Sequence, residues 1–369
     1  MTLRTLAIRD CRNLAAVDIE LSPGLNLFVG PNGAGKTALL EAVHVLARGR
    51  SFRAAQASKV IRHDQAELIV RALLVTEAGS ERTIAIGRPR RGPIKVHVDG
   101  EPVRGIAEIS RLLAVQVMLP GVSDLIFAGP SERRRWLDWG VFHVKPTYIG
   151  HWRRYNQLLK QRNSQLKHQA GSNDQVLLAF TDGLIRAAEP LSQDRADYIQ
   201  RWEPWFRQVL LALDPELAAI GIELAPNGRV NQSQSQGESF ADILSQNLSR
   251  DVKLGVTHNG PHRLELSFTI DGRPASERLS RGQGKTLALA MQISQAELLV
   301  SETGQSSVFL IDDAGAELDH DHNAAFFEAM AATGAQVLAT CTTAPWTGSA
   351  YAGEKRTVFH VKQGQIEAQ

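Results

Sequence analysis

One short segment of the chain has the residue types and spacing of a phosphate-binding loop. Residues 30–37 read GPNGAGKT and fit the pattern G-x-x-x-x-G-K-[ST]. In such a loop, backbone N–H groups surround phosphate oxygens, and the following helix N-terminus adds its dipole. Lys36 is expected to reach the β- and γ-phosphates, and the Thr37 hydroxyl is expected to bind Mg²⁺. The other residues expected to bind the nucleotide here are Gly30, Pro31, Asn32, Gly33, Ala34 and Gly35.

The segments on either side of this loop match the context that the motif requires. Residues 25–29 have the length and composition of a buried strand, and residues 38–47 have helical spacing without Gly or Pro. A chance glycine-rich turn would not need a strand before it and a helix after it. The sequence therefore predicts a site for a nucleoside triphosphate, ATP, with Mg²⁺.

A second segment supplies carboxylates. Residues 306–313 read SSVFLIDD, an apolar strand that ends in Asp312 and Asp313. The first carboxylate is expected to hold Mg²⁺ through water, and the second is expected to orient or deprotonate the attacking water. A strand that ends in a solvated turn would look the same, but the phosphate loop favours the functional interpretation. Lys36, Asp312 and Asp313 form the predicted catalytic set.

Residues 279–286, LSRGQGKT, imitate the end of a second phosphate loop, but position 279 is Leu where that motif needs Gly. The start of this segment instead resembles the LSGGQ signature of ABC-type ATPases. In that family the signature Ser and the helix N-terminus face the γ-phosphate bound by the opposite subunit, which is anion binding supplied in trans. The resemblance assigns Ser280, Gly282 and Gln283 to nucleotide binding, whereas a simple helix cap is the alternative.

Two shorter elements complete this predicted site. Residues 314–319, AGAELD, resemble the D-loop that crosses the dimer seam in such ATPases. Gln116 follows an apolar run and precedes a turn, where a Q-loop glutamine would bind nucleotide and metal. A polar side chain at a strand end is the alternative for Gln116.

The elements that position these motifs change character along the chain. Residues 1–128 alternate like β-structure around the phosphate loop, and residues 129–255 are helical, basic and rich in tryptophan. Residues 256–369 return to strands and helices and carry the signature and the Asp pair. Within the helical region we predict separate helices over 174–188 and 191–213, and a polar surface loop over 227–239. The fold class is therefore α/β, an ABC-type P-loop ATPase head with an inserted helical lobe.

Composition sets broad limits. The chain has 369 residues, of which 43% are hydrophobic and 22% charged, with a net charge of +2. The sequence contains no run of about 18 uncharged apolar residues, so no membrane span is predicted. Its two cysteines suggest free thiols in a reducing cytoplasm. Because the net charge is only +2, any surface that binds nucleic acid must be a local basic patch.

Taken together, these segments resemble the RecF family of bacterial recombinational repair, small relatives of the SMC-type ATPases. The resemblance extends over nearly the whole chain, and residues 130–138, PSERRRWLD, are its most specific part because no generic ATPase needs them. Arg12 and Asn13 match an N-terminal element that contacts nucleotide in this superfamily.

The resemblance implies an ATP-driven homodimer that binds DNA, both double-stranded and at single/double-strand junctions such as gaps. It also implies weak DNA-stimulated ATP hydrolysis that acts as a switch, and help in loading RecA together with RecO and RecR during repair, replication restart and the SOS response. Asp313 is shorter than the Glu of transporter ATPases, which suggests slow hydrolysis. The switch histidine of transporters is absent after residues 336–340.

Two other classes share part of this chemistry. An ABC transporter ATPase would be coupled to a membrane, but the large helical insertion and the missing histidine count against it. A structural chromosome-organising protein of SMC type needs long heptad arms, and no segment here is long enough.

Candidate DNA contacts are two basic patches. Arg88, Arg90 and Arg91 fall on a predicted hairpin tip. The second patch lies on one predicted helix and comprises Arg153, Arg154, Lys160, Arg162 and Lys167. The triplet 133–135 is expected to be partly structural, because Trp136 and Leu137 anchor that helix inward. The five tryptophans of the helical region are expected to lie mostly in its core.

Overall fold

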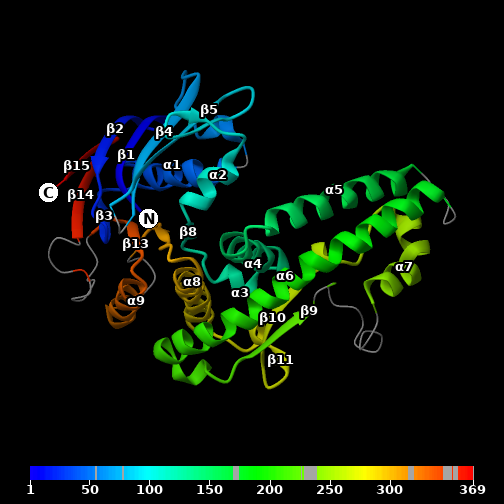
Figure 1. Cartoon of the computed structure of the whole chain (residues 1–369). Coiled ribbons are helices and arrows are strands. Elements are labelled where there is room, and N and C mark those ends of the chain that lie inside the picture. The colour runs from blue at the N-terminus through cyan, green and yellow to red at the C-terminus, as the bar shows by residue number, and fades with distance from the viewer. Residues whose placement is uncertain are drawn as a thin grey trace. The chain divides into compact units, whose positions relative to one another are not determined.

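The strand before the phosphate loop lies inside a six-stranded sheet in the computed structural model (Figure 1). The sheet has the order β15-β14-β3-β13-β12-β8, and all its pairs are parallel except β14 with β15. The carboxyl ends of β3, β12 and β13 therefore share one edge, where ligands bind in open α/β sheets. Its strands are β3 (Leu25–Val29), β8 (Val115–Met118), β12 (Val308–Ile311), β13 (Gln336–Cys341), β14 (Arg356–Lys362) and β15 (Gln365–Ala368).

A second, antiparallel sheet has the order β2-β1-β4-β5-β6-β7. The helix after the phosphate loop, α1 (Lys36–Arg48), packs against β1, β4 and β5 of this sheet and β13 of the other. Because α1 is covered on both faces, every residue from Ala38 to Ala47 is buried. The strands are β1 (Thr2–Cys11), β2 (Leu14–Glu20), β4 (Glu67–Val75), β5 (Glu81–Pro89), β6 (Lys95–Val98) and β7 (Glu101–Pro102).

Residues 1–122 and 296–369 form one unit with these two sheets, and residues 123–295 form another. This division differs from the three predicted segments, because residues 256–295 belong with the helical region. The reason is that β10 (Glu265–Ile270) pairs with β9 (Gly221–Ala225) and packs on α4 (Pro130–Val144). A short strand, β11 (Arg273–Pro274), completes this three-stranded sheet.

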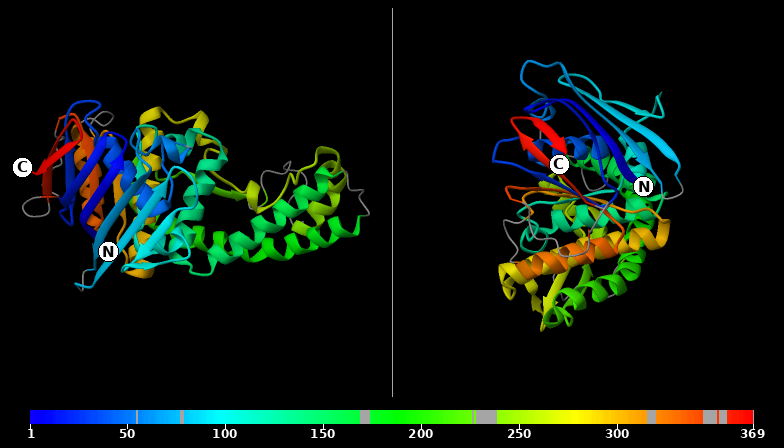
Figure 2. Two further views of the ribbon diagram at one scale, coloured as in Figure 1. Left: turned by 90° about the horizontal axis from the view of Figure 1, so that it is seen from above. Right: turned by 90° about the vertical axis from the view of Figure 1, so that its left-hand side faces the viewer.

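The second unit is dominated by helices. Two long ones, α5 (Tyr148–Lys167) and α6 (Gln175–Leu213), lie side by side, as the green ribbons of Figure 2 show. The predicted break between residues 188 and 191 is wrong, because α6 continues through Pro190 and Pro204. A proline inside a helix is tolerated where tertiary packing outweighs the lost hydrogen bond, and Leu184, Leu191 and Tyr198 of α6 are buried.

The other helices are α2 (Ile106–Leu112), α3 (Asp124–Phe127), α7 (Phe240–Leu254), α8 (Arg281–Thr303) and α9 (His320–Ala332). The structure describes residues 1–54, 56–76, 79–168, 174–225, 227, 239–314, 320–343, 351 and 356–368. Most of the predicted polar loop at 227–239 therefore lies outside the described residues. Across the described ranges, no helix combines the length and the apolar character that crossing a membrane requires.

Candidate nucleotide-binding site

The phosphate loop joins β3 to α1, as predicted from the sequence. Gly35 is the N-cap of α1 with φ 117, and an added Cβ would lie 2.9 Å from Leu14 Cδ2 and 3.1 Å from the Asn13 amide. Both the backbone conformation and the lack of space therefore require glycine here. Pro31, Asn32 and Gly33 are exposed, whereas Ala34 is buried. The tip of the loop is thus open to a ligand.

Lys36 lies across its own loop. Its Nζ donates to the carbonyl oxygens of Gly30 at 2.6 Å and Pro31 at 3.0 Å, and only 8% of the residue is exposed. These are neutral acceptors, and charge-assisted hydrogen bonds to anionic oxygens are about twice as strong. The ammonium therefore lies beside the loop, where the phosphate oxygens of a bound nucleotide would compete with these carbonyl oxygens as its acceptors.

The Asp pair meets the phosphate loop at the shared edge of the parallel sheet. Thr37 Oγ1 donates to Asp312 Oδ1 at 2.8 Å, and Thr340 Oγ1 donates to the same oxygen at 2.8 Å. Thr37 follows β3 through the phosphate loop, Asp312 directly follows β12, and Thr340 lies near the end of β13. These three strands are neighbours in the sheet. The fold therefore brings together Thr37 and Asp312, two of the three residues that the sequence analysis assigned to Mg²⁺.

Thr340 also fixes the backbone of Asp313, the residue that follows Asp312. The Asp313 N–H donates to Thr340 Oγ1 at 2.9 Å, and Asp313 has a φ of 60. A left-handed backbone is uncommon for a residue other than glycine, although aspartate tolerates it better than most. The Asp313 side chain is exposed, in contrast to Asp312, which is half-buried. The turn therefore directs the two carboxyl groups into different surroundings.

Sequence analysis placed Thr340 in a strand but missed its role. The available signal was its position, since a hydroxyl at the carboxyl end of a parallel strand beside β12 can reach the Asp pair. The residue after it, Cys341, is buried, and burial raises the pKa of its thiol to about 11. Cys341 is therefore a protonated, inert wall of the site at neutral pH.

The oxygens at this edge fit a magnesium ion. A hydroxyl and a carboxylate are the hard oxygen ligands that Mg²⁺ takes, and it normally keeps several waters beside phosphate oxygens. The 2.8 Å hydrogen bond between Thr37 and Asp312 shows that both oxygens reach a common point. Such an ion would neutralise charge on the β- and γ-phosphates.

Of the two N-terminal candidates, Asn13 lies at the loop and Arg12 is held by a carboxylate. Asn13 Nδ2 donates to the Gly33 carbonyl oxygen at 3.2 Å. Arg12 forms a two-pronged ion pair with Glu41 of α1, with Nη2 at 2.8 Å from Oε1. Glu41 is fully buried, and this hydrogen-bonded pair raises the pKa of Arg12. The buried carboxylate thus fixes the orientation of Arg12, a role that sequence analysis did not assign to Glu41.

Gln116 does not join the site, contrary to the sequence analysis. It pairs in register with Phe309, three residues before Asp312, which corresponds to roughly 10 Å along a strand. Its Nε2 donates to Ser307 Oγ at 3.3 Å, before the start of β12, and the side chain is buried. The apolar run before Gln116 continues through β8, so Gln116 lies within the strand rather than in the loop after it.

In the second unit, the signature segment caps α8. The Ser280 N–H donates to Gln283 Oε1 at 3.1 Å, and the Gln283 N–H donates to Ser280 Oγ at 3.2 Å. This reciprocal pair is a capping box, so the cap is present as the alternative interpretation expected. Ser280 and Gly282 are nonetheless exposed, and an added Cβ at Gly282 would meet only Ser280 Oγ at 3.8 Å. Packing within the chain does not require glycine at 282, which leaves space above the helix N-terminus.

Phe127 sets the position of this helix within the second unit. An added Cβ at Gly284 would lie 2.3 Å from the Phe127 ring, so the ring rests directly on the first turn of α8. Arg133 holds the segment that carries Phe127, since its Nη1 donates to the carbonyl oxygens of Leu125, Ile126 and Ala128 at 3.0–3.1 Å. The close approach of ring and backbone explains why position 284 is glycine.

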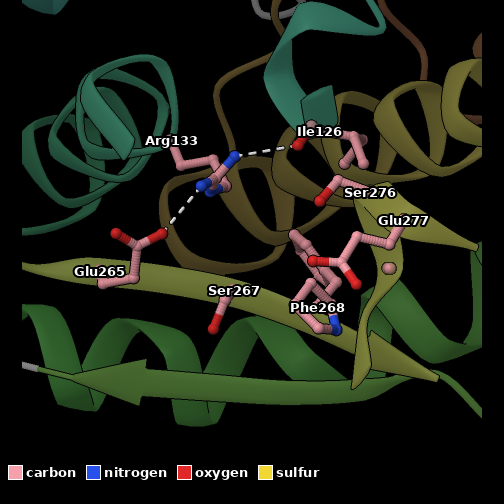
Figure 3. Close-up of a pocket in the computed structure, with 9 residues that line it drawn as sticks. Ile126, Arg133, Glu265, Ser267, Phe268, Ser276 and Glu277 are labelled. Carbon is pink, nitrogen blue, oxygen red and sulfur yellow. Dashed lines mark hydrogen bonds and ion pairs between the residues drawn. The ribbon is translucent and has the colours of Figure 1, made fainter. Parts of the chain in front are cut away.

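Figure 3 shows Arg133 reaching from α4 to Ile126 on one side and Glu265 of β10 on the other, beside a cavity of about 290 Å³. Its Nη2 lies 2.8 Å from Glu265 Oε1, and its Nε donates to the Leu266 carbonyl oxygen. The expected structural role of the arginine triplet therefore holds for Arg133. It links α4, β10 and the segment under the signature helix.

The predicted D-loop at 314–319 lies outside the described residues apart from Ala314. The Ala314 N–H donates to the Thr340 carbonyl oxygen at 2.7 Å. The chain thus leaves the Asp pair alongside the end of β13.

Comparison with known proteins agrees with this geometry. The family model described as RecF/RecN/SMC N terminal domain matches residues 2–367. The DNA replication and repair protein RecF of Erwinia tasmaniensis is 36% identical over 375 residues, covering 100% of this chain and 99% of that protein. The protein of the same name from Vibrio atlanticus is 34% identical over 367 residues, covering 100% and 99%.

Solved structures give the same result. The structure of the recombination mediator protein RecF-ATPrS in the RecFOR pathway has a TM-score of 0.85 and 27% identity, covering 99% of this chain and 97% of that one. An SMC head bound to the C-winged helix domain of ScpA shares the fold, with a TM-score of 0.58 and 15% identity, covering 100% and 97%. The predicted fold class, an ABC-type ATPase head with an inserted helical lobe, is confirmed. The chain belongs to the RecF family, within the RecF/RecN/SMC group of ATPases.

Proposed function

We propose that this protein is an ATP-switched DNA-binding protein of recombinational repair and replication restart, and that it acts in the cytoplasm. The hydrogen bond of 2.8 Å between Thr37 and Asp312 is the observation that carries the proposal, because it joins the two halves of an ATP–Mg²⁺ site. Family membership supplies the biological setting, since the relatives are named DNA replication and repair proteins.

In this proposal, the loop N–H groups and Lys36 bind the phosphates, and Thr37 and Asp312 hold Mg²⁺. Asp313 orients the attacking water, and its short side chain makes hydrolysis weak. The exposed Ser280 and Gly282, with the half-buried Gln283, lie at the N-terminus of α8. They would face the γ-phosphate of a second copy, which couples ATP to homodimerisation. DNA at gaps, the partners RecO and RecR, and loading of RecA follow from the resemblance to this family.

Two basic patches were candidates for DNA contact, and each contains one arginine that already binds elsewhere in its own unit. Arg90 donates to the carbonyl oxygens of Gln65 at 2.5 Å and Arg62 at 2.7 Å, which holds it against its own unit. Arg162 is fully buried and pairs with Asp251 at 2.8 Å, so it is not on the exposed face of α5. The exposed side chains that remain for phosphate contact are Arg91, Arg153, Arg154, Lys160 and Lys167, with Arg88 half-buried.

The transporter alternative is not favoured, because the relatives matching the whole chain are named as DNA repair proteins. The discriminating experiment measures DNA binding to a gapped duplex with and without ATP, alongside flotation with lipid vesicles. We expect ATP-dependent binding to DNA and no flotation. Lys36→Met serves as the control, since loss of the ammonium removes ATP binding and with it the effect of ATP on DNA. Flotation with vesicles, or DNA binding unaffected by Lys36→Met, would contradict the proposal.

A further inference from the structure

A cavity of about 250 Å³ in the second unit is separate from the nucleotide site. It lies between α4 and α5, with Arg195 of α6 and His262 on the remaining side. The wall from α4 includes Arg134, and the wall from α5 includes Trp152 and Asn156. The cavity therefore combines a cation, an amide and an indole, which is the set that recognises a nucleobase and its phosphate.

Trp152 is more exposed than the other tryptophans of this unit, of which Trp205 is half-buried. Trp136, Trp139 and Trp202 are buried in the core, whereas Trp152 is 38% exposed. Large indoles dominate burial energetics, so an exposed one at the wall of a cavity has an apolar face without its usual cover. A stacked planar ligand would cover that face.

Arg134 supplies positive charge at the cavity. Its Nη1 donates to the Leu264 carbonyl oxygen at 2.8 Å, which is a neutral acceptor. The neighbouring arginines are already matched by carboxylates, since Arg135 pairs with Glu132 at 2.9 Å and Arg195 with Asp138 at 2.7 Å. Partial burial lowers the pKa of Arg134, and the positive charges of Arg195 and Arg263 lower it further. The carboxylates of Glu265 and Asp138 act in the opposite direction. An anionic oxygen beside Arg134 would offset both the burial of its charge and the repulsion from the neighbouring arginines.

The floor of the cavity is neutral and fixed. Tyr155 Oη donates to His262 Nδ1 at 2.7 Å, and His262 Nε2 lies 3.1 Å from the Thr257 carbonyl oxygen. These partners place the ring proton on Nε2. Burial lowers the pKa of His262 to about 4, so the ring is neutral at physiological pH. Tyr155 and His262 therefore add no charge that competes with Arg134 for an anion, and the other charged lining residues, Arg135, Asp138 and Arg195, are held in ion pairs.

A basic stripe leaves the cavity along α5. At 100° per residue, Trp152, Asn156, Lys160 and Lys167 fall within an arc of about 80° on the helix surface. Lys160 and Lys167 are both exposed. With a rise of 1.5 Å per residue, Lys160 lies roughly 12 Å and Lys167 roughly 22 Å from Trp152 along the helix. This arrangement suits a strand whose backbone runs along α5.

We propose that this cavity binds one unpaired base of single-stranded DNA, stacked on Trp152 with its phosphate at Arg134, while Lys160 and Lys167 contact the phosphates that follow. The inference rests on the proposed DNA-binding function and adds the site and the class of DNA. A duplex keeps its bases inside stacked pairs, so it cannot place a base in a cavity of this size. The cavity would therefore recognise the unpaired part of a gapped or tailed substrate.

The test compares affinities for an oligothymidylate strand and a blunt duplex, measured by fluorescence anisotropy with the full chain. We expect Trp152→Ala to weaken strand binding about tenfold and to leave duplex binding unchanged, because stacking on an aromatic side chain is lost. Trp152→Phe should retain most of the affinity. Gln161→Ala is the matched control and should have no effect, since Gln161 is exposed and lies about 180° from Trp152 around α5. Arg134→Gln should reduce the slope of log K against log salt for the strand by about 0.7.

Unchanged strand affinity in Trp152→Ala would overturn the inference, and so would equal losses for strand and duplex. In either case wild-type binding to DNA would leave the proposed function standing. A wild-type protein that binds an ATP analogue but neither form of DNA would contradict the proposed function as well. Crosslinking of a strand containing 5-iododeoxyuridine gives a second readout, with Trp152 as the expected adduct.

Discussion

Thr37 and Asp312 are 275 residues apart in the chain, yet their side-chain oxygens lie 2.8 Å apart. The parallel pairing of β3 with β13, and of β13 with β12, brings the ends of these strands to one edge. Thr340 at the end of β13 donates to the same carboxylate oxygen from the strand between them. The expected magnesium site is thus a direct product of strand order.

Thr340 is expected to position the Asp pair. Thr340→Val keeps the shape of the side chain but removes the donor to Asp312 and the acceptor for the Asp313 N–H. Loss of such a supporting hydrogen bond costs about 10–100-fold in metal affinity. We expect the Mg²⁺ concentration for half-maximal ATPase activity to rise by that factor, with ATP binding in EDTA unchanged. Thr340→Ser should restore the wild-type Mg²⁺ dependence, and an unchanged dependence in the valine variant would exclude this role.

Asp313→Asn is expected to separate ATP binding from hydrolysis. The amide still accepts a hydrogen bond but is a far poorer base than the carboxylate. We expect normal affinity for an ATP analogue, loss of steady-state hydrolysis, and an ATP-held dimer that stays on DNA. Turnover is measured by phosphate release. Wild-type turnover in Asp313→Asn would show that another group orients the water.

The contact of Phe127 with Gly284 predicts a pair of compensating substitutions. Gly284→Ala places a Cβ 2.3 Å from the present ring position, and such overpacking costs about 1–3 kcal/mol. We expect lower stability and loss of DNA-stimulated hydrolysis, with ATP affinity retained because the phosphate loop is untouched. Phe127→Leu combined with Gly284→Ala should recover hydrolysis, since the smaller side chain makes room. If the double variant is no more active than Gly284→Ala, the contact does not position the signature.

The hairpin between β5 and β6 gives a test of phosphate contact. Arg88→Glu with Arg91→Glu leaves Arg90 and its carbonyl partners in place. If both side chains contact phosphates, each lost contact reduces the slope of log K against log salt by about 0.9 on duplex DNA. Titrations at several salt concentrations measure this slope. An identical slope would mean that Arg88 and Arg91 are only solvated.

The sequence was most informative where the chemistry lies in one continuous segment. The phosphate loop, the Asp pair and the signature cap are all formed by neighbouring residues, so their types and spacing predicted their local structure. Asn13 was placed at the loop by resemblance to a family, and its contact with Gly33 agrees with that placement.

Sequence reasoning failed where tertiary packing decides the role of a residue. Gln116 and Arg162 are polar residues at plausible positions, but burial commits them to Ser307 and Asp251. Pro190 lies inside α6 because the packed core continues across it. Thr340 and Phe127 act through neighbours that are distant in sequence, so no local pattern marked them. The exposure of Trp152 likewise becomes visible only once the helices are packed.

In the proposed ATP-dependent dimer, Ser280 of one copy completes the site of the other, and light scattering tests this arrangement most directly. Ser280 is exposed, so Ser280→Arg should leave folding and the monomer's ATP affinity nearly intact while a bulky side chain fills the space for the opposite γ-phosphate. With Mg²⁺ and ATP, we predict that the wild-type molar mass doubles and that the Ser280→Arg mass does not change. Doubling in both proteins would contradict the account, and so would a wild-type mass that stays monomeric while the ATP analogue is bound.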